Sequence, residues 1–255
     1  MEDVADIEAV AATRAAACIA TSEKVKSELM KMQVPEERIT VIHNAIEDYW
    51  FEPQRPTAIQ PPHLVFLGRL GGDVFTLKLK GFSRLINFYR AFPDVPKTTI
   101  CMTTNRKLKE WLRVAFPKHY MYTNLRKDLI PGALAPLYGS MLFVSSRYEG
   151  FSLSLVEGMS QGLVPIAYSV GVVPEVIKSG ENGYIVSTFE EACAQARELL
   201  ANDQKRLTMA EAAKATASQF KSSHISSQLI SLYQNLRRDR RLGMNGEEIR
   251  TEPSK

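Results

Sequence analysis

The sequence predicts an α/β fold in which helices flank a parallel sheet. Six short apolar runs are strand candidates: 63–67, 98–102, 120–125, 141–145, 164–168 and 183–186. Helical stretches lie between them: 82–91, 107–116, 132–138, 152–161 and 174–178. Strands that alternate with helices favour a parallel sheet, and right-handed crossovers bring the loops after the strands to one edge.

The segments on either side of this alternation differ from it. Residues 1–52 predict a helix over 2–14, a strand over 16–20, a helix over 23–33 that Ser22 caps, and a strand over 39–42. Residues 53–63 contain four prolines, so we expect a stiff connector there and place a domain boundary at it. The sheet domain then covers 64–222, with helices over 189–201 and 204–220. A helix over 223–241 and a frayed tail complete 223–255.

The composition is that of a globular protein, with 45% hydrophobic residues, 24% charged residues and a net charge of +4. Three well-separated cysteines form no metal or disulfide pattern, and no apolar run approaches the ~20 residues of a membrane span. Without a signal-peptide pattern at the N-terminus, we expect a cytoplasmic protein. The basic run at Arg237, Arg238, Arg240 and Arg241 has two interpretations, a solvated helix end or a peripheral contact with anionic lipid on the inner face of a membrane.

The stretch SSRYEGFSLSLVEGMSQG, 145–162, indicates a strand, a loop and a helix in succession. Parallel sheets bind ligands outside the carboxyl ends of their strands, so Glu149 in the loop and Glu157 in the helix can face one crevice. The loop's backbone N–H groups suit an anion. The two glutamates could be surface charges, a hydrolase pair or ligand-positioning groups. Eight helical residues rise ~12 Å, against about 5–9.5 Å between glycosidase carboxylates, which disfavours hydrolysis.

The first strand of the sheet domain leads into Gly68, Arg69 and Leu70, and Lys80 and Gly81 follow at the expected start of the next helix. A guanidinium and an ammonium near a strand end suit a phosphate or diphosphate, although a solvated loop has the same composition. The sequence has no Asp-x-Asp motif, no metal-ligand spacing of histidines and no G-x-S-x-G elbow. We therefore expect no metal and no serine nucleophile.

These segments together resemble the C-terminal, donor-binding half of glycosyltransferase family 4, whose members have the GT-B fold. The resemblance covers roughly 16–186. ACIATSEKVKSELMKMQVPEERITVIHNAIEDYWFEP is similar to the crossover between the two domains, and LVFLGRL with KGF is similar to the diphosphate loop. SSRYEGFSLSLVEGMSQGLVPIAYSVGVVPEVIKSGENGYIV is similar to the donor-site signature with its Glu-x7-Glu core.

The resemblance implies a Rossmann-like domain of a retaining enzyme that moves a hexose-type sugar from a nucleoside diphosphate to an acceptor hydroxyl. It implies that Arg69 and Lys80 hold the diphosphate, that Glu149 lies by the sugar and that Glu157 binds the ribose. The other donor-site residues that it implies are Gly68, Leu125, Gly150, Phe151, Ser152 and Leu153. No cofactor, metal or nucleic acid is implied. The partners are a nucleotide sugar and a glycan or lipid-linked acceptor, as in polysaccharide or glycoconjugate biosynthesis.

Three departures from the family pattern affect these expectations. The loop between Arg69 and Lys80 is long, so Lys78 could replace Lys80. Gly158 stands where the family has alanine, which weakens the helix by roughly 0.5–1 kcal/mol. An acceptor domain is almost wholly missing from 1–52, so we keep the alternative of a non-catalytic nucleotide-sugar-binding subunit, or a truncated fragment, that needs a separate acceptor domain.

Overall fold

The computed structural model describes residues 2–53, 60–71 and 73–248. Its main body is a six-stranded parallel sheet with the order β5-β4-β3-β6-β7-β8. The strands are β3 (Leu64–Arg69), β4 (Lys97–Met102), β5 (His119–Thr123), β6 (Met141–Val144), β7 (Val164–Tyr168) and β8 (Tyr184–Val186). The expected α/β fold class is therefore confirmed.

The sheet reverses its direction of growth between β3 and β6. From β3 the chain adds β4 and β5 on one side, then returns to place β6 on the other side of β3. The two strands pair at Leu64 with Met141 and at Val65 with Leu142, near their amino ends. Such a reversal leaves a crevice at the carboxyl ends of the strands.

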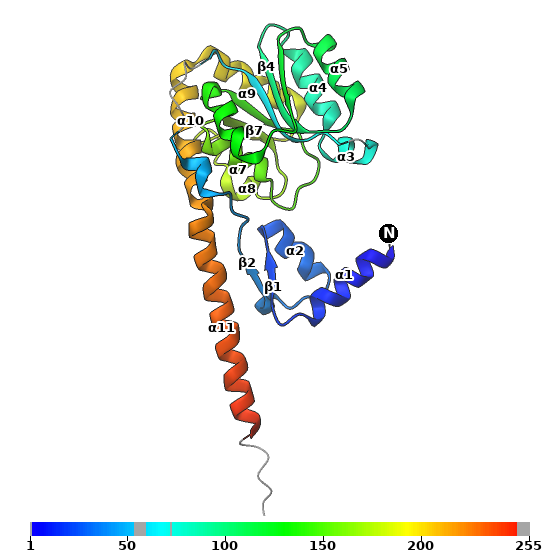
Figure 1. The fold of residues 1–255 in the computed structure, drawn as a ribbon, viewed down its shortest axis with the longest axis vertical. Helices are drawn as coiled ribbons and strands as arrows, with labels where there is room; N and C mark the ends of the chain where they lie inside the picture. Colours follow the sequence, from blue (N-terminus) through cyan, green and yellow to red (C-terminus); the bar gives the residue numbers. More distant parts are fainter. Residues whose placement is uncertain (1, 54–59, 72, 249–255) are drawn as a thin grey trace, which may run out of the picture.

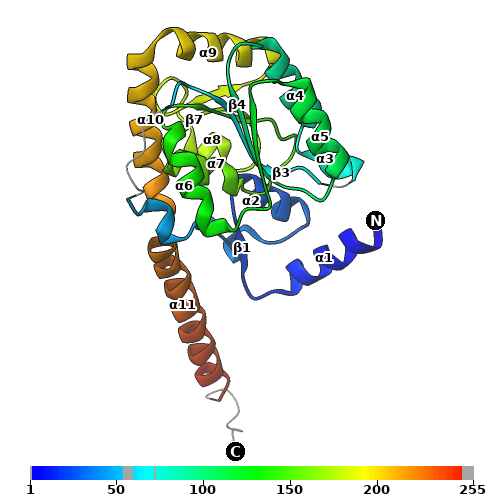
Figure 2. The ribbon, with the colours of Figure 1, turned by 45° about the horizontal axis from the view of Figure 1, so that its top comes forward.

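Helices cover both faces of the sheet, and Figures 1 and 2 show α4 and α5 on the side opposite to α7 and α8. The first layer includes α4 (Phe82–Ala91), α5 (Arg106–Ala115) and α9 (Phe189–Ala201). The second includes α6 (Ile130–Leu134), α7 (Leu153–Ser160) and α8 (Val173–Val176), while α10 (Asp203–Ala217) adds side chains to both cores.

Strand β3 shows why the sequence folds in this way. Leu64 and Phe66 lie in the core with α4 and α5, whereas Val65 and Leu67 lie in the core with α7. Alternate side chains point to opposite faces of a strand, so a continuous apolar run is buried on both sides. Each such side chain contributes roughly 1.5–3 kcal/mol of burial, and this fixes the strand in the middle of the sheet.

The N-terminal segment forms a small unit beside the sheet domain, below it in Figure 1. It contains α1 (Glu2–Arg14), β1 (Cys18–Ala20), α2 (Glu23–Lys31), the short helix η1 (Glu36–Arg38) and β2 (Ile39–Val41). Strands β1 and β2 pair in parallel, and Ala20, Val34 and Ile39 form the core of the unit. As expected, Ser22 caps α2 by accepting from the Val25 N–H at 3.3 Å.

The chain enters the core of the sheet domain before the proline-rich segment. Ile46 and Trp50, the latter in the short helix η2 (Asp48–Phe51), are fully buried in the core that contains α7. The Ile46 N–H donates to the Phe220 carbonyl at 2.9 Å. Most of the expected connector, 54–59, lies outside the described residues.

Two local expectations within the sheet domain were wrong. A helix, α3 (Val74–Leu79), occupies the segment that we expected to be a loop, because Asp73 caps it by accepting from the Thr76 N–H at 2.7 Å. The helix expected over 132–138 is divided among η3 (Lys127–Leu129), α6 and η4 (Ala135–Leu137), and Pro131 and Pro136 each stand at a helix start. Proline removes the N–H that a longer helix would need.

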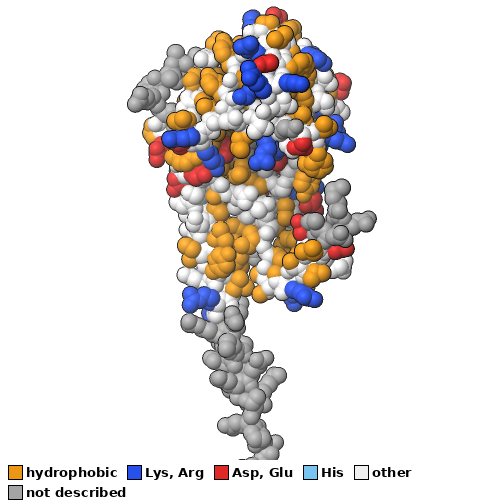
Figure 3. Space-filling model, turned by 45° about the vertical axis from the view of Figure 1, so that its right-hand side comes forward, with side chains coloured by type: hydrophobic (Ala, Val, Ile, Leu, Met, Phe, Trp, Pro, Cys, Tyr) orange, Lys and Arg blue, Asp and Glu red, His pale blue; other side chains and the backbone are white. Residues whose placement is uncertain are grey.

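The C-terminal helix is longer than expected. After the short helix η5 (Ser218–Phe220), helix α11 (Ser222–Glu248) continues into the first part of the tail that we expected to fray, and it projects away from the sheet domain. The rest of that tail, 249–255, lies outside the described residues. Within the described part of the chain, no helix combines the length and apolarity that a membrane span requires. On the face shown in Figure 3, lysine and arginine side chains lie among aspartate and glutamate side chains over the sheet domain.

Candidate functional site

A cavity of about 490 Å³ lies at the carboxyl ends of β3 and β4, where the sheet reverses. Its walls come from these strands, from the loops after β5 and β6, from α7 and from Asn44 in the crossover segment. The predicted site residues that line it are Gly68, Arg69, Lys80, Leu125, Glu149, Phe151, Ser152, Leu153 and Glu157. Gly150 is not among the lining residues. Arg69 and Glu157 thus share one cavity, and the roles assigned to these residues stay predictions.

Lys80 is held at the cavity by its backbone and by its side chain. It ends α3, and its carbonyl accepts a hydrogen bond from the Ser145 hydroxyl at 2.7 Å. Gly81 adopts φ +64°, and a Cβ there would lie 1.8 Å from the Ser145 carbonyl oxygen, so only glycine permits this approach. Lys78 is exposed and does not line the cavity, so it is not placed to replace Lys80.

Glu149 is the ion-pair partner of Lys80. The Lys80 Nζ lies 2.6 Å from Glu149 Oε1, and the Ser146 hydroxyl donates to the same oxygen at 2.7 Å. The pair is only partly exposed, with 27% of the lysine side chain and 14% of the glutamate side chain accessible. An anionic ligand that entered here would meet a lysine already positioned beside Arg69.

Arg84, which the sequence analysis did not select, supports the loop after β6. Its guanidinium stacks on the Tyr168 ring at 3.8 Å and donates to the carbonyls of Ser145 and Ser146. A planar guanidinium suits such a combination of stacking and forked donation. Arg84 lies in α4, fifteen residues after Arg69. Only the three-dimensional structure shows that it contacts the loop after β6.

Ser152 precedes α7 and has an unfavourable backbone conformation. Its φ is 98°, in the left-handed region, and its buried hydroxyl has no hydrogen-bond partner within the described residues. A hydrogen bond of the preceding residue stabilises this conformation, because the Phe151 carbonyl accepts from the Val172 N–H at 2.9 Å. Strain of this kind costs of order 1–3 kcal/mol and is frequent at ligand sites.

Glu157 also lines the cavity and is 8% exposed. Burial raises its pKa to about 7, although Lys127 opposes this with its positive charge. The Lys127 Nζ lies 3.8 Å from Glu157 Oε1. Glu149 and Glu157 therefore have separate lysine partners and do not form a carboxylate pair.

Lys127 and Asn44 also line the cavity and were missed by the sequence analysis. Lys127 begins the short helix η3 and Asn44 lies in a loop, and no chemical motif marks either position. Each reaches the site only when distant segments are brought together. Leu67, Ile100, Cys101, Met102 and Ile130 add to the apolar part of the lining, beside the predicted Leu125, Phe151 and Leu153. Among the described residues, no group of three or more His, Cys, Asp or Glu side chains is arranged to hold a metal ion.

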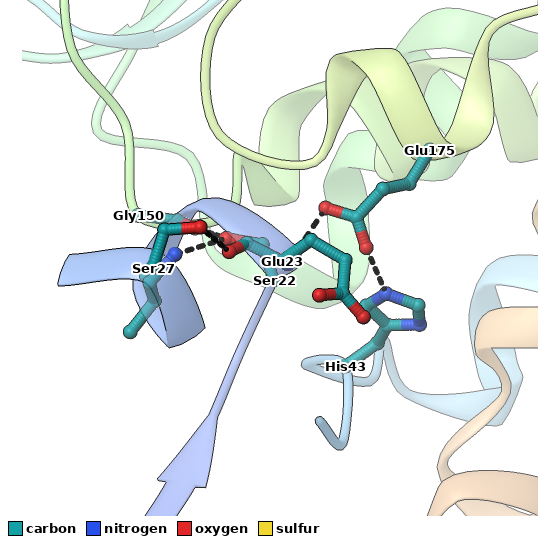
Figure 4. Close-up of polar contacts among 7 residues, drawn as sticks. Ser22, Glu23, Ser27, His43, Gly150 and Glu175 are labelled. Carbon is teal, nitrogen blue, oxygen red and sulfur yellow. Dashed lines mark hydrogen bonds and ion pairs between the residues drawn. The ribbon is translucent and has the colours of Figure 1, made fainter. Parts of the chain in front are cut away.

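The N-terminal unit contacts the loop that carries Glu149 (Figure 4). The buried Ser22 hydroxyl donates to the Gly150 carbonyl at 2.7 Å. Glu175, in α8, accepts from the Glu23 N–H at 3.0 Å and pairs with His43 Nε2 at 2.9 Å. The same loop therefore faces the cavity on one side and the N-terminal unit on the other.

Comparison with known proteins finds a matching family and similar sequences. Residues 131–216 match the family described as "Glycosyl transferases group 1". A 106-residue stretch is 34% identical to N-acetyl-alpha-D-glucosaminyl L-malate synthase of Bacillus anthracis, covering 40% of this chain and 28% of that protein.

Solved structures show the same fold at low sequence identity. Sucrose-phosphate synthase from Thermosynechococcus elongatus superposes with a TM-score of 0.75 at 18% identity, over 92% of this chain and 62% of that one. HepE from Anabaena, in complex with UDP and glucose, superposes with a TM-score of 0.67 at 20% identity, over 90% and 66%. The chain thus spans less than two thirds of each of these three relatives. Residues 131–216 thus match glycosyltransferase group 1 proteins, and the chain shares its fold with GT-B glycosyltransferases.

Proposed function

We propose that this chain is the donor-binding part of a retaining glycosyltransferase and holds a nucleoside diphosphate sugar in the cavity. One observation carries the proposal: two cationic side chains, Arg69 and Lys80, and a buried carboxyl group, Glu157, line the same cavity at the reversal of a parallel sheet. Cations suit the diphosphate and a carboxylate suits the adjacent hydroxyls of a ribose. The Anabaena neighbour, which was solved with UDP and glucose, supports this ligand class.

In the proposed reaction, the bond between the sugar's anomeric carbon and the diphosphate breaks, and a bond from that carbon to the acceptor oxygen forms. The diphosphate leaves with the bonding electrons, and one of its oxygens takes the proton that the acceptor hydroxyl loses. Arg69 and Lys80 would stabilise that developing charge, and donors held in place before the reaction usually make the largest catalytic contribution. Glu149, paired with Lys80, would lie by the sugar.

Titration calorimetry with UDP, GDP and ADP tests the proposal. We expect at least one of the three to bind, and we expect Lys80→Met to weaken that binding about 10- to 100-fold, as loss of a charge-assisted hydrogen bond predicts. Lys78→Met is the matched control, because Lys78 is exposed and outside the cavity. Absence of binding to all three at millimolar concentration would contradict the proposal.

Turnover is a separate question, because the chain spans 28% of the curated relative and 62% of the first structural neighbour. Release of the nucleoside diphosphate from a bound donor, with and without acceptor hydroxyls, measures it. Binding without turnover would favour the alternative that the chain is a nucleotide-sugar-binding subunit with a separate acceptor domain.

A further inference from the structure

Lys127 lies at the cavity between two carboxylates from distant parts of the chain. Its Nζ is 2.7 Å from Glu47 Oε1 and 3.8 Å from Glu157 Oε1. Glu47 immediately precedes η2, Lys127 begins η3, and Glu157 lies inside α7. The contact between η2 and α7 brings the first and last of these segments together.

The three side chains differ in their exposure to water. Those of Lys127 and Glu47 are each 45% exposed, whereas that of Glu157 is 11% exposed. Lys127 donates a hydrogen bond to Glu47, but at 3.8 Å it only attracts Glu157. The buried carboxyl group therefore faces the cavity beside a positive charge, without a hydrogen bond from it.

The charge state of Glu157 near neutral pH depends on this arrangement. Burial raises its pKa to about 7, Lys127 lowers that value and Glu47 raises it. Tyr49 is the other titratable group that faces the cluster, and burial, with the charges of Glu47 and Glu157, raises its pKa. Since Tyr49 is neutral near pH 7, the balance lies between Lys127 and Glu47.

We propose that Lys127 is a positioning residue that keeps Glu157 ionised, so that its carboxylate can accept hydrogen bonds from two adjacent hydroxyls of the donor nucleotide, and that Glu47 opposes it. The inference rests on the function proposed above and deepens it. An ionised carboxylate is an acceptor only, whereas a protonated one gives up part of its acceptor capacity. Donor affinity is therefore expected to rise with pH through neutrality.

The first arm of the test needs no ligand. The carboxyl carbon of Glu157 in the unliganded chain is titrated by ¹³C NMR. We expect Lys127→Met to move the midpoint up by roughly one pH unit, as the charge of a partly exposed lysine at this distance suggests. Glu47→Gln should lower the Glu157 midpoint by a smaller amount, and Lys127→Arg should leave the midpoint at its wild-type value. Lys205→Met is the matched control, because Lys205 pairs with Glu198 on α9, away from the cavity.

The second arm measures binding of the nucleoside diphosphate glucose whose base the wild type accepts. A sugar nucleotide is used because its phosphates do not titrate near pH 7, unlike a terminal phosphate with a pKa near 6. We expect Lys127→Met to weaken binding about five-fold at pH 7, with recovery by pH 9, given a one-unit midpoint shift. A purely structural role for Lys127 would weaken binding equally at both pH values.

The two arms separate the inference from the function on which it rests. Opposite midpoint shifts together with a recovery of affinity at high pH support the inference. Unchanged midpoints, or an affinity loss that does not depend on pH, overturn it even if the wild type binds the nucleotide. If the wild type binds no nucleotide, the proposed function fails and the ligand role of Lys127 fails with it, whatever the NMR midpoints show.

Discussion

Glu157 is one of the buried residues of α7 and follows the fully buried Val156. Its pKa of about 7 lies above the ordinary value of 4.5 because burial disfavours the charged form. Below the ordinary pKa, the folded and unfolded chains both hold the proton and burial carries no charge penalty. As pH rises from about 4.5 to about 7, the unfolded chain ionises first, so the free energy of unfolding falls.

Replacing Glu157 with glutamine should therefore stabilise the fold in a pH-dependent way. We expect no gain near pH 4, a growing gain between pH 4.5 and 7, and a gain of up to roughly 3 kcal/mol above pH 7. Urea denaturation at pH 4, 6 and 8 measures it. A gain of equal size at all three pH values would show that packing, and not the charge, decides the effect.

Ser152 shows a related compromise at a single residue. A left-handed φ of 98° and an unpartnered buried hydroxyl both disfavour the fold. Ser152 also lines the cavity, so both features lie at the candidate site. The site is thus built from groups that the isolated fold does not satisfy.

At the scale of elements, Gly158 of α7 packs directly against Leu142 of β6. A Cβ on Gly158 would lie 2.6 Å from Leu142 Cδ2 and 3.4 Å from Leu163 Cδ1. The glycine that weakens the helix by its intrinsic propensity is therefore the residue that allows the helix to approach the sheet. Since Glu157 is the preceding residue, this approach also sets its position.

Gly158→Ala should destabilise the protein by roughly 1–3 kcal/mol, the usual cost of overpacking, even though alanine is the better helix former by about 1 kcal/mol. Thermal unfolding of Gly158→Ala, Leu142→Ala and the double variant forms a cycle. We expect the double variant to be more stable than the sum of the two single effects predicts, because truncation of Leu142 makes room for the methyl group. Strict additivity would argue against the contact.

The elements also show what the sequence could and could not predict. The strands and the Glu-x7-Glu segment could be predicted because short apolar runs that alternate with helical stretches, and an apolar helix face, are strong signals. Helix α3 was missed because its start at Asp73 follows two glycines and it contains six residues. Lys127 and Arg84 were missed because their relation to the site is one of distance in space, and no spacing along the chain reports it.

At the scale of the whole molecule, the N-terminal unit is joined to the site by polar contacts. Glu175 contacts both Glu23 and His43, and Ser22 contacts Gly150 (Figure 4). The order of the Glu149–Ser152 loop is therefore coupled to a unit that lies outside the sheet domain. The sequence predicted the strands of this unit, but not that Glu175 would connect it to the sheet domain.

Glu175→Ala should loosen the N-terminal unit without loosening the sheet. Discounted for partial exposure, the loss of the charged acceptor is worth about 1 kcal/mol, so we expect about five-fold faster amide hydrogen exchange in β1, α2 and β2. Exchange in β3 and β6 should stay unchanged. Glu181→Ala on the neighbouring exposed turn is the control. Equal acceleration in the sheet would mean that the two parts open together.

The pairing of β3 with β6 determines when the cavity forms during folding. Leu64 and Met141 are distant in sequence, and their pairing joins the two halves of the sheet. Long-range parallel pairing forms slowly, because the chain loses the entropy of closing a large loop before the contact stabilises it. A newly synthesised chain can form its helices early, but the cavity is absent until β3 pairs with β6. A ligand of this cavity would therefore bind only the folded protein.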